Sequence, residues 1–271
     1  LVDEGQDFES EWWQLLRTHL LRPDGEMLLV ADRTQNLFQR SNWTESGTVG
    51  GGFSGPWTQL KGTYRMPVDL IPIVSEYATT YLPDDDRDLP TVELDHPTLG
   101  DAHKPTHRRW VNVAEVDIVE ATADEVTRLI QDVEGLSPSD IVLLTDHEVG
   151  LEIIDALRAR GNDVVSLFTA TDGDHRRRLK KAFWAGAPGV KGCTVHSFKG
   201  WESKAVVCVP VVMGELQLYI AMTRVKAAPS RPAYLSVVNA VDSLRGFKSR
   251  FEREVLPSEV PALAGQVTLD L

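Results

Sequence analysis

The sequence predicts an α/β fold built on parallel β-sheets. Short apolar runs, each about the length of one strand, end at acidic or polar residues. Stretches with a helical spacing of apolar residues separate these runs, so the chain repeats a strand-helix-strand pattern. In such sheets, ligands bind beyond the carboxyl ends of the strands. The acidic and polar residues that follow the strands are therefore the candidate functional residues.

The composition is that of an ordinary globular protein, with 271 residues of which 42% are hydrophobic and 25% charged. The best apolar run, residues 205–212, is as long as a strand and far too short for a membrane span. The net charge of −12 argues against binding nucleic acid by overall charge, but it is compatible with a local basic groove. Cys193 and Cys208 lack metal-ligand spacing, so we expect buried thiols in a reducing compartment, the cytoplasm.

The chain opens with LVDEGQDF, two apolar residues that run into a cluster of acids. A buried strand that ends in this way places carboxylates at a phosphate and metal site. One carboxylate there can hold Mg²⁺ through water, and its neighbour can take a proton from an attacking water. The alternative is a solvated turn. Because the chain begins within this predicted strand and has no initial Met, we expect it to be a fragment.

A helix is predicted for residues 10–21, a turn for Pro23-Asp24-Gly25, and a second strand for residues 26–31, which ends at Asp32. Residues 46–56 are glycine-rich, but a phosphate-binding loop needs a Gly-Lys-Ser or Gly-Lys-Thr, and the chain contains neither. This stretch is therefore predicted to be a flexible loop.

A further helix is predicted for residues 67–81, with Pro67 near its first turn, and an irregular linker for residues 83–109. His96, His103 and His107 lie in this linker without metal-ligand spacing, so we expect them to be solvated.

The rest of the chain alternates strands and helices, which predicts a second parallel sheet. Residues 122–125 match a capping box that would begin a helix at 123–133, and Gly161 would end a helix at 148–160. Residues 175–181 (HRRRLKK) are the most basic run, and they either contact a phosphate backbone or form a charged helix face. The predicted strands are 110–120, 140–144, 164–168, 192–195, 205–212 and 232–238, and the closing helix is 240–251.

Five segments, read in order, resemble motifs II to VI of the UvrD/Rep-like superfamily 1 helicases. They are DEGQD (3–7), ADRTQ (31–35), GTYR (62–65), TVHSFKGWE (194–202) and YIAMTR (219–224). The resemblance covers roughly residues 1–226. It implies two RecA-like parallel-sheet domains of the P-loop NTPase fold, the first one incomplete. The implied boundaries are 1–66 for the first domain, 67–109 for a linker, 110–251 for the second domain and 252–271 for a tail.

The resemblance assigns nucleotide contacts to several residues, with ATP and Mg²⁺ as cofactors. It implies that Asp3 holds Mg²⁺ through water, Glu4 activates the attacking water and Gln35 senses the γ-phosphate. It further implies that Arg224 neutralises charge that builds up during transfer. Others follow by the same resemblance: Tyr64 stacks on adenine, Arg65 contacts the γ-phosphate, and Gly200 and Glu202 lie near the nucleotide.

The same resemblance places Thr194 and His196 on the DNA backbone and Phe38 against a base. Lys199 would pair with an acid or a phosphate, and Tyr219 and Ala221 would be core residues. The sequence departs from the family pattern at Thr63, where Asn is usual, at the spacing of Phe38 and Arg40, and in the short gap between Glu202 and Tyr219. The extra domain that larger members insert before motif V is expected to be absent or reduced to residues 170–190.

These residues predict a fragment of an ATP-dependent DNA helicase or translocase that moves on single-stranded DNA. Trp43 and Trp57 are further candidates for stacking on bases. One alternative is a helicase-like ATPase that acts as a switch in a repair or defence complex without unwinding. Another is a helicase-derived interaction module that has lost catalysis. The expected partners are single-stranded DNA and a fused or associated nuclease, repair or defence subunit, with no membrane.

Overall fold

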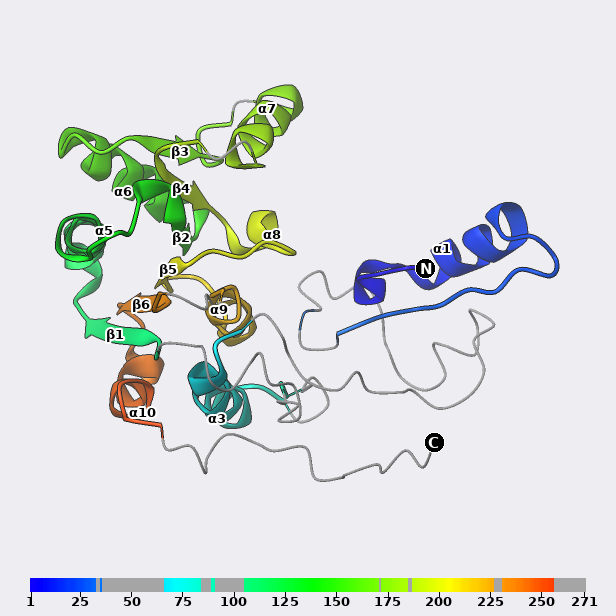
Figure 1. Cartoon of the computed structure of the whole chain (residues 1–271), viewed down its shortest axis with the longest axis horizontal. Coiled ribbons are helices and arrows are strands. Elements are labelled where there is room, and N and C mark those ends of the chain that lie inside the picture. The colour runs from blue at the N-terminus through cyan, green and yellow to red at the C-terminus, as the bar shows by residue number, and fades with distance from the viewer. Residues whose placement is uncertain are drawn as a thin grey trace.

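A six-stranded sheet organises the chain from residue 105 onward in the computed structural model (Figure 1). The structure describes residues 1–32, 35, 66–83, 89–90, 105–170, 172–184, 187–226 and 231–255. The strand order is β1-β6-β5-β2-β4-β3, and every pairing is parallel. The predicted α/β fold with a parallel sheet is therefore confirmed. The strands are β1 (His107–Asn112), β2 (Ile141–Thr145), β3 (Val164–Ser166), β4 (Val190–Cys193), β5 (Ala205–Val209) and β6 (Tyr234–Asn239).

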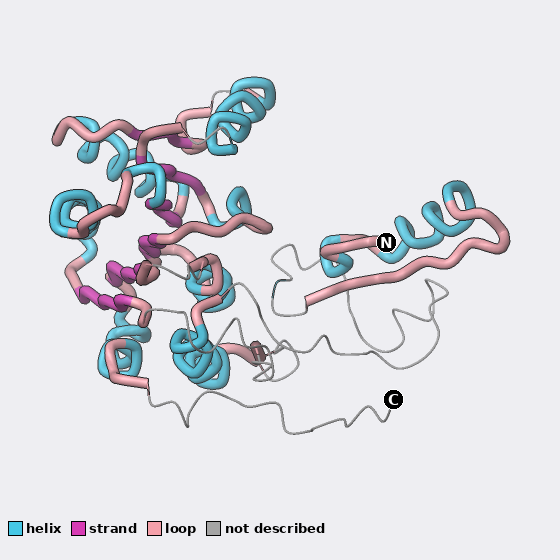
Figure 2. Tube along the Cα trace, viewed as in Figure 1, coloured by secondary structure: helices cyan, strands magenta, loops and turns pink. Residues whose placement is uncertain are grey.

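Helices cover both faces of this sheet, which explains why its central strands are apolar without alternation. In β2, Val142 and Leu144 pack into one buried cluster, whereas Ile141 and Leu143 pack into the other. The first cluster contains residues of α3 (Ile71–Tyr81), α8 (Val195–Phe198), α9 (Glu215–Met222) and α10 (Lys248–Phe251), and the second contains residues of α5 (Ile118–Asp132) and α6 (His147–Ala159). The sheet is therefore the middle layer of three (Figure 2).

Helix α3 lies within residues 67–109, the predicted linker, but it packs on the sheet domain. Its Tyr77 lies 5.2 Å from the ring of Phe247, and its hydroxyl donates to the carbonyl of Glu215 at 3.3 Å. Burial, reinforced by Glu215, raises the pKa of Tyr77 far above its usual range. Trp110 and Phe251 extend this aromatic cluster, with ring centroids 5.1 Å apart. The cluster joins α3 to the C-terminal helices.

Short helical turns connect or extend the main elements. They are η1 (Gly5–Asp7), η4 (Val68–Leu70), η6 (Glu115–Asp117), η7 (Pro138–Asp140) and η8 (Asp242–Phe247), all 3-10 turns, and the π-helical η2 (Leu16–Leu20) that continues α1 (Ser10–Leu15). Helix α7 (Gly173–Trp184) lies between β3 and β4. The helices predicted at 10–21, 67–81, 148–160 and 240–251 are confirmed with small shifts in their ends. None of the helices in the described ranges is long and apolar enough to cross a membrane.

The strand predicted for residues 26–31 is wrong in extent. The segment pairs in parallel with the start of the chain through one bridge between Val2 and Leu29. Val2 donates to the carbonyl of Leu28 at 2.8 Å and accepts from the amide of Val30 at 2.9 Å. In the described residues the pairing is limited to this one bridge.

The strand predicted at 110–120 and the capping box at 122–125 are also corrected. Strand β1 ends at Asn112 because its partner β6 ends opposite it at Asn239. Helix α5 begins at Ile118, so Thr122 lies inside it and donates to the carbonyl of Ile118 at 2.7 Å instead of capping. Glu125, expected to cap, is buried and accepts from Ser236 and Arg128.

Gly189 tests the close packing at the start of β4. A Cβ atom at this position would lie 2.5 Å from the carbonyl oxygen of Asp163, a backbone atom that cannot rotate away. We expect Gly189→Ala to lower the free energy of unfolding by about 2–3 kcal/mol, as overpacked sites do. The measurement is urea unfolding. Gly246→Ala is the control because nothing lies within 4 Å of its added Cβ. Equal unfolding midpoints for the two variants would contradict this packing.

Candidate active site

The acidic segment at the start of the chain has a strained conformation. Glu4 has a φ of 54° and a ψ of 42°, which is the left-handed region, and η1 begins directly after it. It is the only residue other than glycine with positive φ in the described ranges. Such a conformation costs about 1–3 kcal/mol and persists only where surrounding contacts hold it. The Glu4 amide donates to Oδ1 of Asp3 at 2.9 Å, which is one of those contacts.

Gln6 is fully buried and ties the acidic segment to the segment that ends at Asp32. Its Nε2 donates to Oε2 of Glu4, and its Oε1 accepts from the amide of Asp32 at 3.0 Å. Both polar ends of the side chain therefore orient acids at one site. The sequence pattern did not single out Gln6 as a site residue. The available signal was its position between the acids of the first motif.

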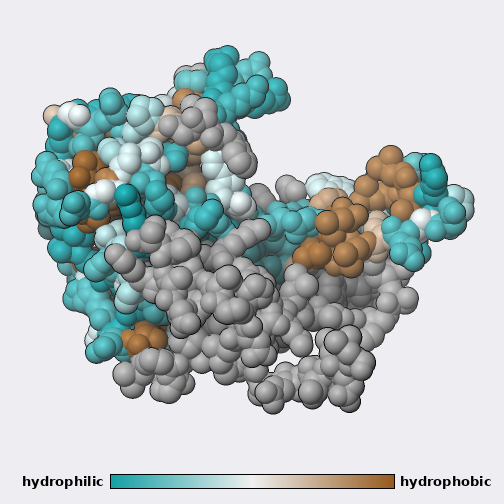
Figure 3. Space-filling model, viewed as in Figure 1, coloured by the Kyte–Doolittle hydropathy of each residue, from teal (hydrophilic) through white to brown (hydrophobic). Residues whose placement is uncertain are grey.

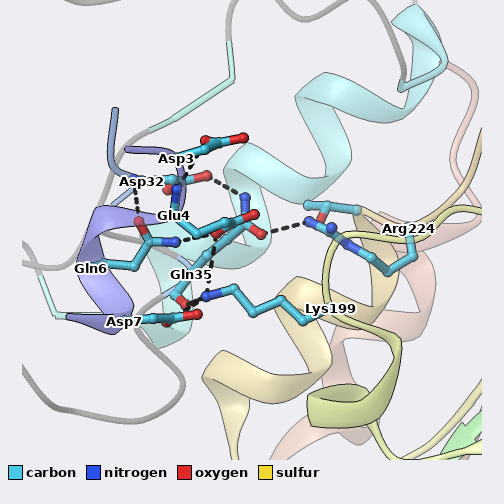
Figure 4. A network of polar contacts seen from close by, with 9 residues as sticks. Asp3, Glu4, Gln6, Asp7, Asp32, Gln35, Lys199 and Arg224 are labelled. Carbon is cyan, nitrogen blue, oxygen red and sulfur yellow. Dashed lines mark hydrogen bonds and ion pairs between the residues drawn. The ribbon is translucent and has the colours of Figure 1, made fainter. Parts of the chain in front are cut away.

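Arg224 reaches this site from the end of α9 (Figure 4). Its Nη2 donates to Oε1 of Gln35 and to Oγ1 of Thr223, both at 3.0 Å. The nitrogen Nε donates to the carbonyl of Ile220 at 3.2 Å, which fixes the plane of the guanidinium. Gln35 in turn donates from Nε2 to Oδ2 of Asp32 at 2.5 Å. Residues 189 positions apart are thus in direct contact.

Arg224 is buried and surrounded by acids, which have opposite effects on its guanidinium. Only 8% of the residue is exposed, and desolvation lowers the pKa of its guanidinium. The charges of Glu4, Asp32 and Glu202 act in the opposite direction and raise it. Since arginine stays protonated in proteins, a buried positive charge lies among three carboxylates. An anionic group that entered here would have to displace Gln35 or Thr223 to pair with Nη2 of Arg224.

Lys199 is a second cation that reaches the acids from the sheet domain. Its Nζ lies 2.6 Å from Oδ1 of Asp7 and 3.4 Å from Oε2 of Glu4, and 8% of its side chain is exposed. It also donates to the backbone carbonyl of Gln35 at 3.0 Å. Of the two partners predicted for Lys199, an acid or a phosphate, the acid is present here. A buried ammonium with several oxygen partners is held in a defined position.

The backbone explains why Glu202 and Arg224 lie near each other. Ser203 and Val225 form a parallel bridge, in which the Ser203 amide donates to the carbonyl of Arg224 at 3.0 Å. Gly200, at φ 81°, makes the turn that leads from α8 to Glu202. The structure therefore brings Asp3, Glu4, Gln35, Glu202 and Arg224 into one region. Glu202 also lies 3.9 Å from Nζ of Lys226.

Thr194 and His196 lie at a different place, in a cavity of about 310 Å³ at the carboxyl ends of β2, β3 and β4. Thr194 caps α8, and its Oγ1 accepts from the amide of Ser197 at 3.3 Å. His196 is half-buried. Hydroxyl, imidazole, amide and guanidinium groups line much of the cavity, a set suited to anionic oxygens. The lining residues are Thr145, Asp146, His147, Leu167, Phe168, Arg176, Thr194, Val195, His196, Ser197 and Gln217.

Several predicted residues fall outside the described ranges, namely Phe38, Arg40, Trp43, Trp57, Thr63, Tyr64, Arg65, His96, His103 and the glycine-rich stretch. His107 is described. It lies exposed on β1, with its ring stacked on Tyr234 at 5.1 Å. Cys193 and Cys208 are buried, free thiols, as predicted, and burial raises the pKa of each far above its usual range. Tyr219 and Ala221 are core residues, also as predicted.

The donor set fits the terminal part of a nucleotide only in part. Arg224 offers a buried fork for phosphate oxygens, and the exposed Asp3 is available to a hydrated cation. Within the described residues, no group of three or more His, Cys, Asp or Glu is arranged to hold a metal ion directly. The chain contains no Gly-Lys-Ser or Gly-Lys-Thr, so its own residues leave part of a triphosphate charge without neutralisation.

Comparison with known proteins finds solved structures of limited similarity and no family. No family profile matches the sequence, and no curated protein matches it. Among solved structures, the C-terminal domain of a possible DNA helicase from Lactobacillus plantarun WCFS1 has a TM-score of 0.38 and 14% identity, over 76% of this chain and 99% of that one.

Two further similar structures are DEAD-box proteins. The C-terminal domain of Dbp5 has a TM-score of 0.39 and 16% identity over 56% of this chain and 86% of that one. SrmB of E. coli, solved with the regulator of ribonuclease activity A, has a TM-score of 0.40 and 18% identity over 58% of this chain and 95% of that one. These likenesses do not establish a family for this chain.

Proposed function

We propose that this chain is part of an ATP-dependent helicase or translocase that moves on single-stranded DNA. The observation that carries the proposal is the contact between Nη2 of Arg224 and Oε1 of Gln35 at 3.0 Å. It joins the N-terminal part of the chain to Arg224 of the sheet domain, 189 positions later in the sequence. The site thus combines carboxylates, a polar sensor and two cations drawn from both parts of the chain. This combination suits phosphoryl transfer, where positioning and charge neutralisation supply most of the catalysis.

Each residue of the site has a role in this proposal. Bound ATP with Mg²⁺ would supply the phosphoryl group that is transferred to water. Glu4 would take the proton of that water, and Asp3 would hold a hydrated cation. Arg224 would donate to oxygens that gain charge, with Gln35 fixing its direction. Lys199 would hold Glu4 and Asp7 at their present positions.

The proposal also needs a phosphate-binding lysine from outside residues 1–271. An exposed apolar face on the N-terminal segment is where we place the part that carries it. Figure 3 shows apolar residues gathered on this segment. Its large apolar side chains that are exposed are Leu1, Trp12, Leu15, Leu20 and Leu28. Contiguous apolar surface of this kind marks a site of association.

Motion follows from the two-part construction of the site. Arg224 and Lys199 belong to the sheet domain, whereas the acids belong to the N-terminal segment. Contacts between the two parts would strengthen with nucleotide and weaken after hydrolysis, so the parts would close and open. DNA held at Thr194 and His196 on the sheet domain would then be displaced relative to the acidic segment.

Residues 1–271 alone are expected to show no ATP hydrolysis above background, because no lysine of a phosphate-binding loop is present. The measurement is phosphate release with and without single-stranded DNA. The comparison is the same chain joined to a segment with a G-x-x-x-x-G-K-[ST] sequence, for which we expect DNA-stimulated turnover. Robust turnover by residues 1–271 alone would contradict the proposed division of the site. No turnover by either protein would contradict the proposed ATPase.

A second candidate is an ATPase that switches a partner without unwinding. The favouring observation is that β3 and β4 are joined in the described residues by α7 and short flanking turns, with no inserted domain between them. A tailed duplex separates the two candidates. A helicase separates its strands during hydrolysis, whereas a switch hydrolyses ATP and leaves the duplex intact.

A further inference from the structure

Helix α7 is the most basic element of a chain whose net charge is −12. It carries five cations, Arg176, Arg177, Arg178, Lys180 and Lys181, against one acid, Asp174. Figure 1 shows it beside β3 and β4 at one end of the sheet, and Figure 3 shows a hydrophilic projection from the body at the same place. Positive charge is thus concentrated on one projecting helix.

The apolar side of α7 fixes how it sits on the domain. Phe183 is buried, and its ring lies 5.9 Å from that of Trp201. Leu179 packs against the same buried cluster. With these two residues turned inward, the three arginines remain exposed. The helix is therefore held by its apolar face while its arginines face solvent.

Among the described residues, most of these cations have no carboxylate partner. Arg177 pairs with Asp174 at 3.0 Å, and both side chains are largely exposed. Arg176, Arg178, Lys180 and Lys181 form no ion pair within the part of the chain that the structure describes. Positive charges this close in sequence repel one another, so an external polyanion would bind favourably along this helix.

Arg176 connects this basic face to the cavity that holds Thr194 and His196. The titratable groups lining the cavity are Asp146, His147, Arg176 and His196. Asp146 is the one acid among them, and its Oδ2 already accepts from the amides of Val212 and Met213 at 3.0 Å each. The hydroxyls of Thr194 and Ser197 lie in the same lining. Arg176 thus places the first turn of α7 at the edge of the cavity, beside its hydroxyl and imidazole groups.

We propose that α7 binds the sugar-phosphate backbone of the single strand that the cavity holds, so that the strand follows the helix after it leaves the cavity. The inference rests on the proposed function. Arginines suit this task because their forks match phosphate oxygens without reading bases. Binding along α7 is therefore independent of base sequence, and it weakens as salt rises because counterions compete for the phosphates.

The test is binding of a fluorescent oligothymidylate to the whole chain at several salt concentrations. Replacing both Arg176 and Arg178 with Ala is expected to weaken binding about 25-fold at 0.1 M salt and to lower the salt slope by about 1.4, the effect of two phosphate contacts on a single strand. The variant with both changed to Lys keeps the charge and is expected to bind within a few-fold of the unchanged protein. Circular dichroism checks that each variant is folded.

Controls separate this inference from the function on which it rests. Replacing Arg158 and Arg250 with Ala removes the same charge at positions on α6 and α10 that do not line the cavity, and it is expected to leave the salt slope unchanged. If the unchanged protein binds the oligothymidylate and the Arg176/Arg178 variant binds it equally well, the role of α7 is overturned while the proposed function stands. An unchanged protein that does not bind would overturn the proposed function and this inference together. Equal competition by polyglutamate would also overturn the inference, because the surface would then accept any polyanion.

Discussion

Changing Arg224 to Ala is expected to lower ATP hydrolysis by about 10³-fold or more in the chain joined to a P-loop segment, the range seen when an arginine that stabilises transferred charge is lost. The reason is its position. The guanidinium is buried, held by Ile220 and Thr223, and directed at Gln35 beside the acidic segment. The measurement is steady-state phosphate release at saturating ATP.

One further variant and an unfolding measurement show whether the effect comes from the paired donors of the guanidinium or from a weakened fold. Arg224→Lys keeps a positive charge but loses the paired donors of the guanidinium. We therefore expect its rate of ATP hydrolysis to stay nearly as low as that of Arg224→Ala. In Arg224→Ala, Gln35 and Thr223 also lose the guanidinium as a hydrogen-bond partner. We expect this loss to lower the free energy of unfolding by about 1–3 kcal/mol. Hydrolysis by Arg224→Ala within a few-fold of the unchanged protein would exclude the proposed role.

Changing Glu4 to Gln is expected to lower hydrolysis in the same joined protein by about 10²–10⁴-fold, the usual contribution of a general base. ATP binding should persist, because Gln is nearly isosteric with Glu and its carbonyl can still accept from Nε2 of Gln6. Lys199 keeps its contact with Asp7 at 2.6 Å. A fluorescent ATP analogue measures binding separately from turnover.

Glu11→Gln is the matched control. Glu11 is exposed on the neighbouring helix α1, and its substitution removes the same charge as Glu4→Gln. Its hydrolysis rate should equal that of the unchanged protein. If Glu4→Gln turned over at that same rate, another group would have to accept the proton. If it lost ATP binding as well, Glu4 would be a binding residue rather than the base.

The strands of the sheet were predictable where both faces are buried. Ile141, Val142, Leu143 and Leu144 form a continuous apolar run, and burial on two faces requires no alternation. Predictions failed where a local pattern competed with tertiary contacts. Thr122 and Glu125 have the spacing of a capping box. In the structure, Glu125 instead accepts a hydrogen bond from Oγ of Ser236, on a strand distant in sequence, at 2.6 Å. A sequence motif cannot report a partner 111 positions away.

The sequence motifs named residues that the fold places close together, but they did not give the contacts among them. Glu4, Gln35 and Arg224 were identified from short motifs, and the structure brings them together. The roles of Gln6 in orienting the acids and of Lys199 in pairing with Asp7 follow from burial and distance, which spacing does not encode. The separation of Thr194 and His196 into their own cavity is likewise a property of the folded chain.

By itself, the sequence determined where the buried strands of the sheet and several of the helices lie, because burial follows the period of apolar residues along the chain. It also determined which chemical groups stand at the strand ends. Only the tertiary structure decided that Arg224 meets Gln35 and that Arg176 opens onto the cavity. Both outcomes depend on the parallel order of the six strands and on the bridge between Ser203 and Val225, and these are long-range pairings that no local pattern specifies.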